Sequence, residues 1–168
     1  MYNNVGPEYC ALGEYQLGLE NYEKALETRL KRFGPGQLAS ACSYISIGYI
    51  YSGLGKYQKA LAYYEKALEI RLKFLGAEAL DIAECYSRIG SVYRNLEEYE
   101  LAMKNHQKAL SNRVSIQGAV HPDLIYYYQN IGRDYYKLEE YQLALDNYKR
   151  VLEIKLEYLN TVHPEVAW

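Results

Sequence analysis

A pattern that returns every 42 residues limits how this chain can fold more than any other feature. The same residue type recurs at this spacing in two series, Gly6, Gly48, Gly90 and Gly132, and Tyr15, Tyr57, Tyr99 and Tyr141. A fixed period of this size indicates stacked copies of one supersecondary unit, each sharing its core with its neighbours. The 168 residues hold four such periods. The pattern is typical of scaffolds that bind other chains, and it leaves the partner undefined.

The first apolar stretch of each period has the spacing of an amphipathic helix. In the second period Tyr44, Ile47 and Tyr51 lie three and four residues apart, which places them on one helical face. The corresponding residues of the other periods are Tyr2, Val5, Tyr9, Tyr86, Ile89, Tyr93, Tyr128, Ile131 and Tyr135. Gly48 also lies on this face. Because glycine costs about 1 kcal/mol of helix propensity there, it predicts the close approach of a neighbouring helix.

A short turn and a second amphipathic stretch complete each period. In the second period Ala60, Tyr64 and Ala67 follow the turn at helical spacing. Small residues beside aromatic ones at a helix crossing indicate a helical hairpin that is packed antiparallel. A helix often closes on a residue in the left-handed conformation, usually glycine and next asparagine. The expected ends of the second helices are therefore Gly34, Gly76, Gly118 and Asn160.

Tyrosine is unusually abundant, with 21 residues against two phenylalanines and one tryptophan. Fifteen of the tyrosines occupy the repeated columns, where helix packing explains them better than an aromatic binding surface does. His106 takes the place of tyrosine in one of these columns, whose other members are Tyr22, Tyr64 and Tyr148. We therefore expect His106 to be a packing residue rather than a catalytic one.

The motif Tyr-x-x-Ile-Gly-x-x-Tyr, followed by Ala-x-x-x-Tyr-x-x-Ala-Leu, resembles the tetratricopeptide repeat. Extra residues at 27–34 and 69–76 and the His-Pro turns at His121 and His163 resemble the longer repeats of kinesin light chain and nephrocystin-3-like proteins. The resemblance covers essentially the whole chain. It implies an all-α fold, a right-handed superhelical solenoid of four antiparallel helix-turn-helix repeats.

The expected domain organisation is one repeat array over residues 1–168. The repeats are expected at 1–37, 38–79, 80–121 and 122–163, and residues 164–168 begin a further repeat. Joined tail to head, residues 163–168 and 1–6 reproduce the pattern of residues 121–132, so a first helix is expected to be split across the termini. Two explanations stay open: a segment of a longer array, or copies that stack head to tail into a filament or tube. Stacking would involve Met1, Tyr2, Val5, Val166 and Trp168.

The resemblance also implies that the first helices line a concave groove, which holds an extended peptide or a partner helix. Asparagines at the position of Asn4 and Asn130 commonly grip the peptide backbone in this family, whereas Ser46 and Arg88 occupy that position in the middle repeats. Helix geometry predicts that the columns between the packed ones are exposed in the groove. These are Cys42, Ile45, Ser46, Tyr49, Ser52, Glu84, Ser87, Arg88, Ser91, Arg94, Asn95, Tyr126, Gln129, Asn130, Arg133, Tyr136 and Lys137.

Four cations in these columns, Arg88, Arg94, Arg133 and Lys137, would gather positive charge in the second half of the groove. Arginine binds carboxylates through paired hydrogen bonds, so an acidic peptide is the partner that would suit this face. The alternative is a solvated face whose cations pair with neighbouring acids. The predicted groove residues are Asn4, Tyr49, Arg88, Arg94, Tyr126, Asn130, Arg133 and Lys137.

Composition and motifs argue against other classes of function. A net charge of −2 gives no general attraction to nucleic acid or anionic lipid, and no apolar run is long enough to span a membrane. Phosphate loops, nucleophile elbows and metal-ligand pairs at helical spacing are missing, so we expect no catalytic residue, no cofactor and no metal. Three cysteines without metal spacing, Cys10, Cys42 and Cys85, favour a reducing compartment and a cytoplasmic location.

Overall fold

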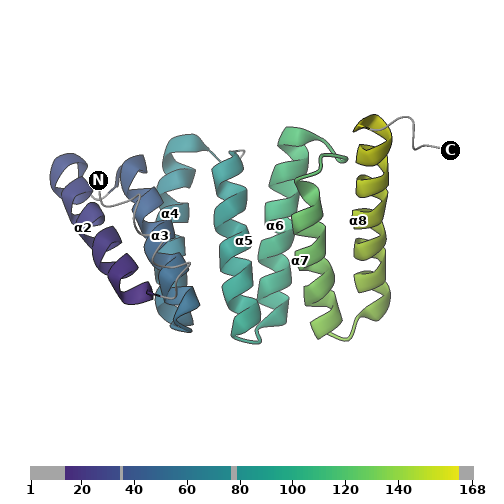
Figure 1. Ribbon diagram of the computed structural model, residues 1–168, viewed down its shortest axis with the longest axis horizontal. Coiled ribbons are helices and arrows are strands. Elements are labelled where there is room, and N and C mark those ends of the chain that lie inside the picture. Colours follow the sequence, from purple (N-terminus) through teal and green to yellow (C-terminus); the bar gives the residue numbers. More distant parts are fainter. Residues whose placement is uncertain (1–13, 35, 77–78, 163–168) are drawn as a thin grey trace. The chain divides into compact units, whose positions relative to one another are not determined.

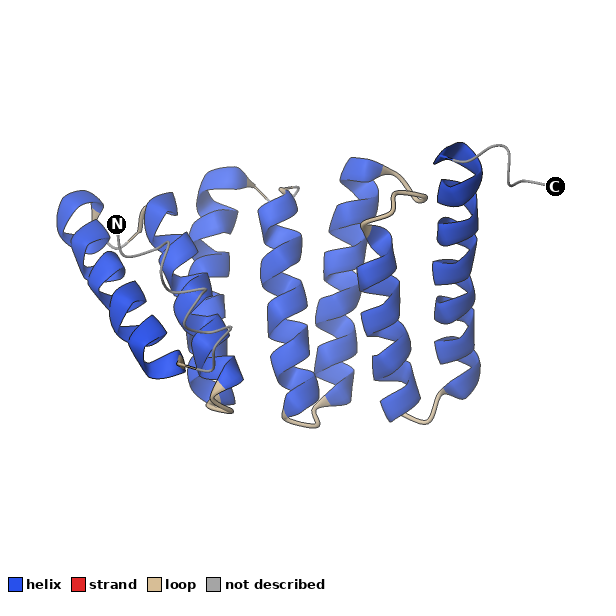
Figure 2. Ribbon diagram, viewed as in Figure 1, coloured by secondary structure: helices blue, strands red, loops and turns tan. Residues whose placement is uncertain are grey.

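The structure is a computed structural model that describes residues 14–34, 36–76 and 79–162. Within these residues there are seven α-helices joined by turns, and there is no β-strand (Figures 1 and 2). The chain divides into two compact units, residues 1–76 and 77–168. The all-α fold that the period predicts is confirmed.

Unit 1 contains three helices, α2 (Tyr15–Phe33), α3 (Leu38–Gly53) and α4 (Tyr57–Leu75). The middle helix packs against both of the others. Its core consists of the repeated apolar columns, because Ile47 and Ile50 of α3 and Ala60 and Ala67 of α4 are fully buried. The helical hairpin that the spacing predicts is therefore formed by α3 and α4.

Unit 2 contains four helices, α5 (Leu80–Asn95), α6 (Tyr99–Gln117), α7 (Leu124–Lys137) and α8 (Tyr141–Val162). Consecutive helices run in opposite directions and pack side by side, and α5 also contacts α7 (Figure 1). A small buried cluster of Ala83, Ala109 and Tyr127 joins α5, α6 and α7. The unit is thus a pair of hairpins whose first helices, α5 and α7, touch each other.

Three glycines bring a ring against a first helix, as the sequence predicts. A Cβ atom at Gly48 would lie 2.7 Å from the ring of Tyr64, and one at Gly132 would lie 2.8 Å from the ring of Tyr148. At Gly90 the ring is the imidazole of His106, which such a Cβ would approach to 2.8 Å. Distances this short do not occur for real Cβ atoms, so these positions need glycine unless the ring moves.

The second helices end at glycines, but their closing conformation differs from the predicted one. Gly34, Gly76 and Gly118 have φ values of 83°, 76° and 81°, so a positive φ is confirmed. Their ψ values of 167°, 173° and 169° place them in an extended region that essentially only glycine populates. Asparagine does not replace glycine there. The prediction that Asn160 ends the last helix is wrong, because α8 continues to Val162.

The turns inside the hairpins also require a positive φ. Gly55 adopts a φ of 70° between α3 and α4. The equivalent residues of unit 2 are Glu97 and Glu139, with φ values of 63° and 62°. A side chain in the left-handed region costs roughly 1–2 kcal/mol, so unit 2 carries backbone strain that unit 1 avoids at its turn.

Tyrosines of the repeated columns mostly pack between helices, as predicted. Buried examples are Tyr22, Tyr44, Tyr51 and Tyr64. In α8 the same columns are less buried: Tyr148 packs against Gly132 and Tyr141 contacts the ring of Tyr136, but both tyrosines stay exposed on their other side.

Helices α3 and α5 begin at Leu38 and Leu80, where the second and third repeats are expected to begin. Helix α7 begins at Leu124, two residues after the expected start of the fourth repeat. The predicted helix split across the termini, with Met1, Tyr2, Val5, Val166 and Trp168, lies outside the described residues.

Candidate binding face on helices α5 and α7

Helix α7 is buried on one side and exposed on the other. Leu124 and Ile131 are buried, whereas Tyr126, Arg133 and Lys137 project from the opposite side. Spacings of seven and four residues align these three side chains along the helix. We call Tyr126, Arg133 and Lys137 the α7 face, and their predicted exposure is confirmed.

Two cations of the α7 face remain available to a ligand. Within the part of the chain that the structure describes, neither Arg133 nor Lys137 takes part in a hydrogen bond, an ion pair or a ring contact. They lie one helical turn apart, so their positive charges act on the same region of solvent. A guanidinium beside an ammonium group can hold a carboxylate through charge-assisted hydrogen bonds.

Arg88 of α5 already has an acidic partner. Its Nε and Nη2 atoms donate to Oε1 of Glu84, at 3.0 and 2.8 Å, one helical turn away. Both side chains are about one third exposed, so the pair adds little to stability. For Arg88 the structure therefore shows the alternative arrangement, in which a cation of this face pairs with a neighbouring acid.

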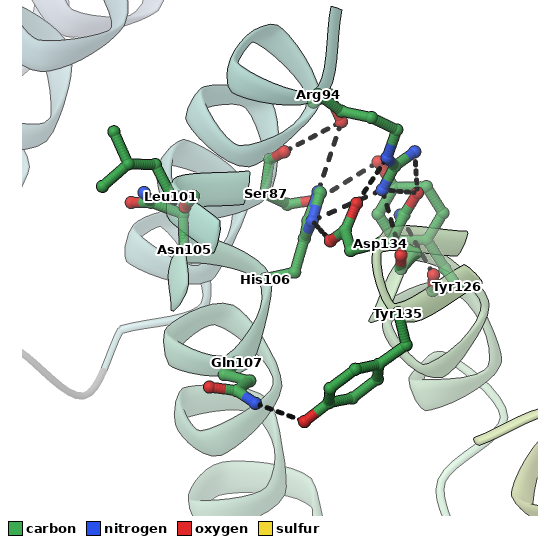
Figure 3. A network of polar contacts seen from close by, with 11 residues as sticks. Ser87, Arg94, Leu101, Asn105, His106, Gln107, Tyr126, Asp134 and Tyr135 are labelled. Carbon is green, nitrogen blue, oxygen red and sulfur yellow. Dashed lines mark hydrogen bonds and ion pairs between the residues drawn. The ribbon is translucent and has the colours of Figure 1, made fainter. Parts of the chain in front are cut away.

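Arg94 of α5 points toward α7 rather than toward solvent (Figure 3). Its Nε atom donates to Oδ1 of Asp134 at 2.5 Å, and Nη1 donates to the Oδ1 atom of Asn130 at 3.1 Å. The Nη2 atom donates to the backbone carbonyl of Asn130, also at 3.1 Å. The guanidinium is therefore occupied within the protein and joins α5 to α7.

His106 of α6 completes this network from a third helix (Figure 3). Its Nδ1 atom lies 2.5 Å from Oδ2 of Asp134, and both side chains are fully buried. Its Nε2 atom lies 3.4 Å from Oγ of Ser91. We call Arg94, His106, Asn130 and Asp134 the polar network. It ties α5, α6 and α7 together around one buried carboxylate, which has a donor at each oxygen.

The polar network is formed by residues that depart from the repeat. Asp134 occupies the column of Ile50 and Val92, whose remaining member is Glu8, and His106 stands where the other repeats have tyrosine. Each residue alone reads as a local exception, and the sequence analysis did not single out Asp134. The signal that could have found it is that a carboxylate and a histidine replace the apolar and aromatic residues of the second and third repeats, on successive helices.

Three residues that were expected to be exposed are in fact buried. Asn130 is 4% exposed, because its Nδ2 atom donates to the Tyr126 carbonyl at 3.0 Å while its Oδ1 atom accepts from Arg94. Ile45 and Ser87 are also buried. The prediction of exposure is therefore wrong at these three positions, since single-helix geometry does not show how closely the next helix packs.

A pocket of about 310 Å³ lies beside the α7 face. It is lined by Leu80, Asp81, Glu84, Ser87, Arg88, Arg113, Tyr126 and Tyr127. The hydroxyl of Ser87 donates to the Tyr126 hydroxyl at 3.2 Å, which links α5 to α7 between two lining residues of the pocket. The pocket thus has acids and Arg88 on its α5 wall and tyrosines on its α7 wall.

Arg113 of α6 supports the α7 wall of the pocket. Its Nε atom donates to the Tyr127 hydroxyl at 2.9 Å, and its guanidinium carbon lies 5.5 Å from the centre of that ring. Burial raises the pKa of the Tyr127 hydroxyl, while the hydrogen bond and charge of Arg113 oppose the shift. Arg113 also lies 3.5 Å from Asp123, so its charge is partly neutralised.

The other predicted groove residues belong to a different part of the chain. Tyr49 is exposed on α3 in unit 1, and Asn4 lies outside the described residues. A binding role for either residue stays a prediction. Over residues 14–34, 36–76 and 79–162, no group of three His, Cys, Asp or Glu side chains could hold a metal ion. In the same ranges no helix is both long and apolar enough to cross a membrane.

Solved structures with the same fold come from several proteins. BtubC (BKLC) from P. vanneervenii matches with a TM-score of 0.86 at 24% identity, over 94% of this chain and 63% of that chain. A putative kinesin light chain from Podospora anserina, with nearly identical TPR-like repeats, has a TM-score of 0.83 at 18% identity, over 97% and 77%. MamA has a TM-score of 0.67 at 20% identity, over 95% and 79%. At these identities the likeness shows the fold, and this chain spans less than two thirds of the BtubC chain.

Sequence comparison identifies the family directly. No curated protein matches the sequence significantly. The family model of the tetratricopeptide repeat matches residues 1–73 and 79–157, which is most of the chain and agrees with the helical hairpins of both units. The chain therefore belongs to the tetratricopeptide repeat family.

Proposed function

We propose that this chain is a non-catalytic scaffold that binds a protein or peptide along α5 and α7. The observation that carries the proposal is the α7 face, where Arg133 and Lys137 are exposed and have no partner among the described residues. Tetratricopeptide repeats generally mediate protein–protein interaction, which supports the scaffold role. Two adjacent cations favour a ligand that carries carboxylates.

The neighbouring pocket adds a second requirement on the ligand. Tyr126 belongs to both the α7 face and the pocket, so a peptide bound at Arg133 can extend into the pocket. Asp81 and Glu84 line the α5 side of that pocket, and a second carboxylate there would be repelled. The ligand that fits best has an acidic residue at Arg133 and Lys137 and a neutral or basic residue at the α5 wall.

We infer a structural rather than a catalytic role for Ser91, His106 and Asp134, although these residue types form hydrolase triads. Ser91 lies inside α5, and its hydroxyl donates to the Ser87 carbonyl at 3.0 Å. The N–H groups of a helix interior are bonded to carbonyls of the same helix, so they cannot form an oxyanion hole. The imidazole of His106 is also fully buried, away from any substrate.

We also propose a cytoplasmic location. Cys42 is an exposed free thiol, which suits a reducing compartment.

The proposal is tested by selecting a random peptide display library on the wild-type chain. We expect enriched peptides to contain Asp or Glu, and Arg133→Glu to weaken their binding about 10- to 100-fold, because a charge-assisted contact is lost and replaced by repulsion. Lys104→Glu, which changes an exposed cation on α6, is the matched control and should leave binding unchanged. Enrichment without acidic residues, or an equal loss in both variants, would refute the proposed site.

A further inference from the structure

A second pocket lies beside the loop between α6 and α7. Residues of this loop form one wall, and Glu157 and Tyr158 in the last turns of α8 form the other (Figure 1). The pocket has a volume of about 460 Å³, and we call it the loop pocket. Among the described residues it shares no lining residue with the pocket beside the α7 face. It therefore offers a surface that the proposed scaffold function does not use.

Side chains at both ends of the loop hold its wall in place. Nη2 of Arg150 on α8 donates to the carbonyl of Ala119 at 3.1 Å. Nε2 of Gln117 donates to Oδ2 of Asp123 at 3.2 Å, which joins the two ends of the loop. The backbone N–H of Asp123 donates to Nδ1 of His121, also at 3.2 Å. Because this wall is formed before any ligand arrives, binding costs little ordering of the loop.

The contact between Asp123 and His121 also determines which ring nitrogen of the histidine can act on a ligand. Since Nδ1 accepts a hydrogen bond from the backbone, the ring proton is on Nε2. Among the described residues Nε2 has no hydrogen-bond partner, and the side chain of His121 is 40% exposed. His121 thus gives the loop pocket an N–H donor that suits a carbonyl oxygen, such as that of a peptide backbone.

Glu157 gives the loop pocket its charge. Of the described residues that line the pocket, Glu157 alone is an acid, and none is a lysine or an arginine. Its carboxylate takes part in no ion pair or hydrogen bond within the described ranges. The same column of the repeat has Lys31 and Lys73 in unit 1 and Ser115 in α6. The charge of this column is therefore reversed at the pocket, which favours a cationic ligand.

Apolar groups line much of the rest of the loop pocket. The ring of Tyr158 belongs to α8, and Val120 and Pro122 belong to the loop. Tyr158 and Val120 are 50% and 37% exposed, so both present apolar surface to solvent. A lysine or arginine side chain can cover such surface with its methylene stem while its charged end stays beside a carboxylate. A tyrosine ring also attracts cations through its π face, so the lining suits both parts of a long basic side chain.

We propose that the loop pocket binds an arginine or lysine side chain of a partner protein. The cationic end pairs with Glu157, and the methylene stem lies on the ring of Tyr158. A neighbouring backbone carbonyl of the partner accepts a hydrogen bond from Nε2 of His121. This preference for a basic residue is opposite to the preference of the α7 face, and the inference does not depend on the proposed function.

Titration of the isotope-labelled full chain with the peptide acetyl-Gly-Arg-Gly-amide, followed by NMR, tests the proposal. We expect saturable shifts of the backbone amide signals of residues 118–121 and 157–158, with a Kd on the order of 1 mM for so small a ligand. The neutral peptide acetyl-Gly-Gln-Gly-amide should bind at least about 3-fold more weakly, because it carries no charge for Glu157. Equal affinities of the two peptides, or no saturable shift at these residues up to about 10 mM, would overturn the proposal.

Reversing the charge of Glu157 gives the sharpest arm of the experiment. Glu157→Lys restores the lysine of unit 1, so it should weaken binding of the arginine peptide about 10-fold or more and favour acetyl-Gly-Glu-Gly-amide instead. Glu100→Lys is the matched control, since Glu100 is an exposed glutamate at the end of α6 away from the loop, and it should leave binding unchanged. The amide signals outside the pocket check that each variant keeps its fold. An unchanged affinity in Glu157→Lys, or an equal loss in Glu100→Lys, would overturn the proposed site.

Discussion

Two equivalent positions of the repeat are apolar in unit 1 and polar in unit 2. In unit 1 they are Tyr22 of α2 and Ile50 of α3, and both are buried. In unit 2 they are His106 and Asp134, which lie 2.5 Å apart and bind Arg94 as a third member. The difference shows that the repeat specifies which backbone positions face each other, while the side chains at those positions can change together.

The apolar pair of unit 1 and the polar pair of unit 2 differ in the contacts that they need from surrounding side chains. An apolar pair is stabilised by burial alone, whereas the carboxylate of Asp134 is tolerated because Arg94 and His106 each bind one of its oxygens. A buried network of this kind contributes little net stability compared with an apolar pair, but it fixes the relative orientation of the helices that it joins. In unit 2 it holds α7 relative to α5 and α6, and α7 carries Arg133 and Lys137.

The largest effect is expected for Asp134→Val. The substitution introduces the residue that the third repeat has at Val92, yet it should lower the free energy of unfolding by about 3–5 kcal/mol, because it leaves Arg94 and His106 without their shared acceptor. Urea unfolding measures the change. Asp146→Val, at an exposed acid of α8, is the control and should change stability by less than about 0.5 kcal/mol. A loss below about 1 kcal/mol for Asp134→Val would contradict a structural role for the network.

Intermediate effects are expected at the glycines that contact a ring. Gly48→Ala and Gly90→Ala each put a Cβ within 3 Å of a ring atom and should cost about 1–3 kcal/mol. The cost should be larger at Gly90, because Asp134 holds the His106 ring in place. Gly36→Ala meets nothing within 4 Å and is the control. Equal costs at Gly48 and Gly90, by thermal or urea unfolding, would show that the network does not hold the ring.

The smallest change in stability is expected at the turns inside the hairpins, where the two units can be compared directly. Glu97→Gly should raise stability by about 1 kcal/mol, because it relieves a positive φ, and Gly55→Glu in unit 1 should lower it by a similar amount. The pair of variants is its own control, since the same exchange is made in opposite directions at equivalent positions. If both variants shift the unfolding midpoint in the same direction, the turn strain is not the cause.

Most of the fold could be predicted from the sequence, because the same pattern of residues occurs four times along the chain. Four aligned copies identify the packing columns, the turns and the glycines that meet a ring, and a chance pattern would not recur at one spacing. The positions and conformations of the helix ends were harder to predict from the sequence. The extended conformation of Gly34, Gly76 and Gly118 depends on the path of the next segment, and the sequence alone did not show that Asn160 remains helical.

The candidate site could be predicted only in part. Tyr126, Arg133 and Lys137 were found because one helix face is enough to determine their exposure. Arg94 and Asn130 were not placed correctly, because their surroundings come from α5, α6 and α7 at once. The residues that depart from the repeat, such as His106 and Asp134, indicate the polar network. Their meaning becomes clear only when it is known which residues of neighbouring helices face each other.

The central claim is that His106 and Asp134 are a coupled departure from the repeat, and a double-mutant cycle tests it most directly. His106→Tyr, Asp134→Val and the double variant, which restores the tyrosine and valine of Tyr64 and Val92, are compared by urea unfolding. We predict that the double variant is more stable than Asp134→Val alone, with a coupling energy of about 1–3 kcal/mol. Strictly additive effects, with a coupling energy near zero, would contradict the claim.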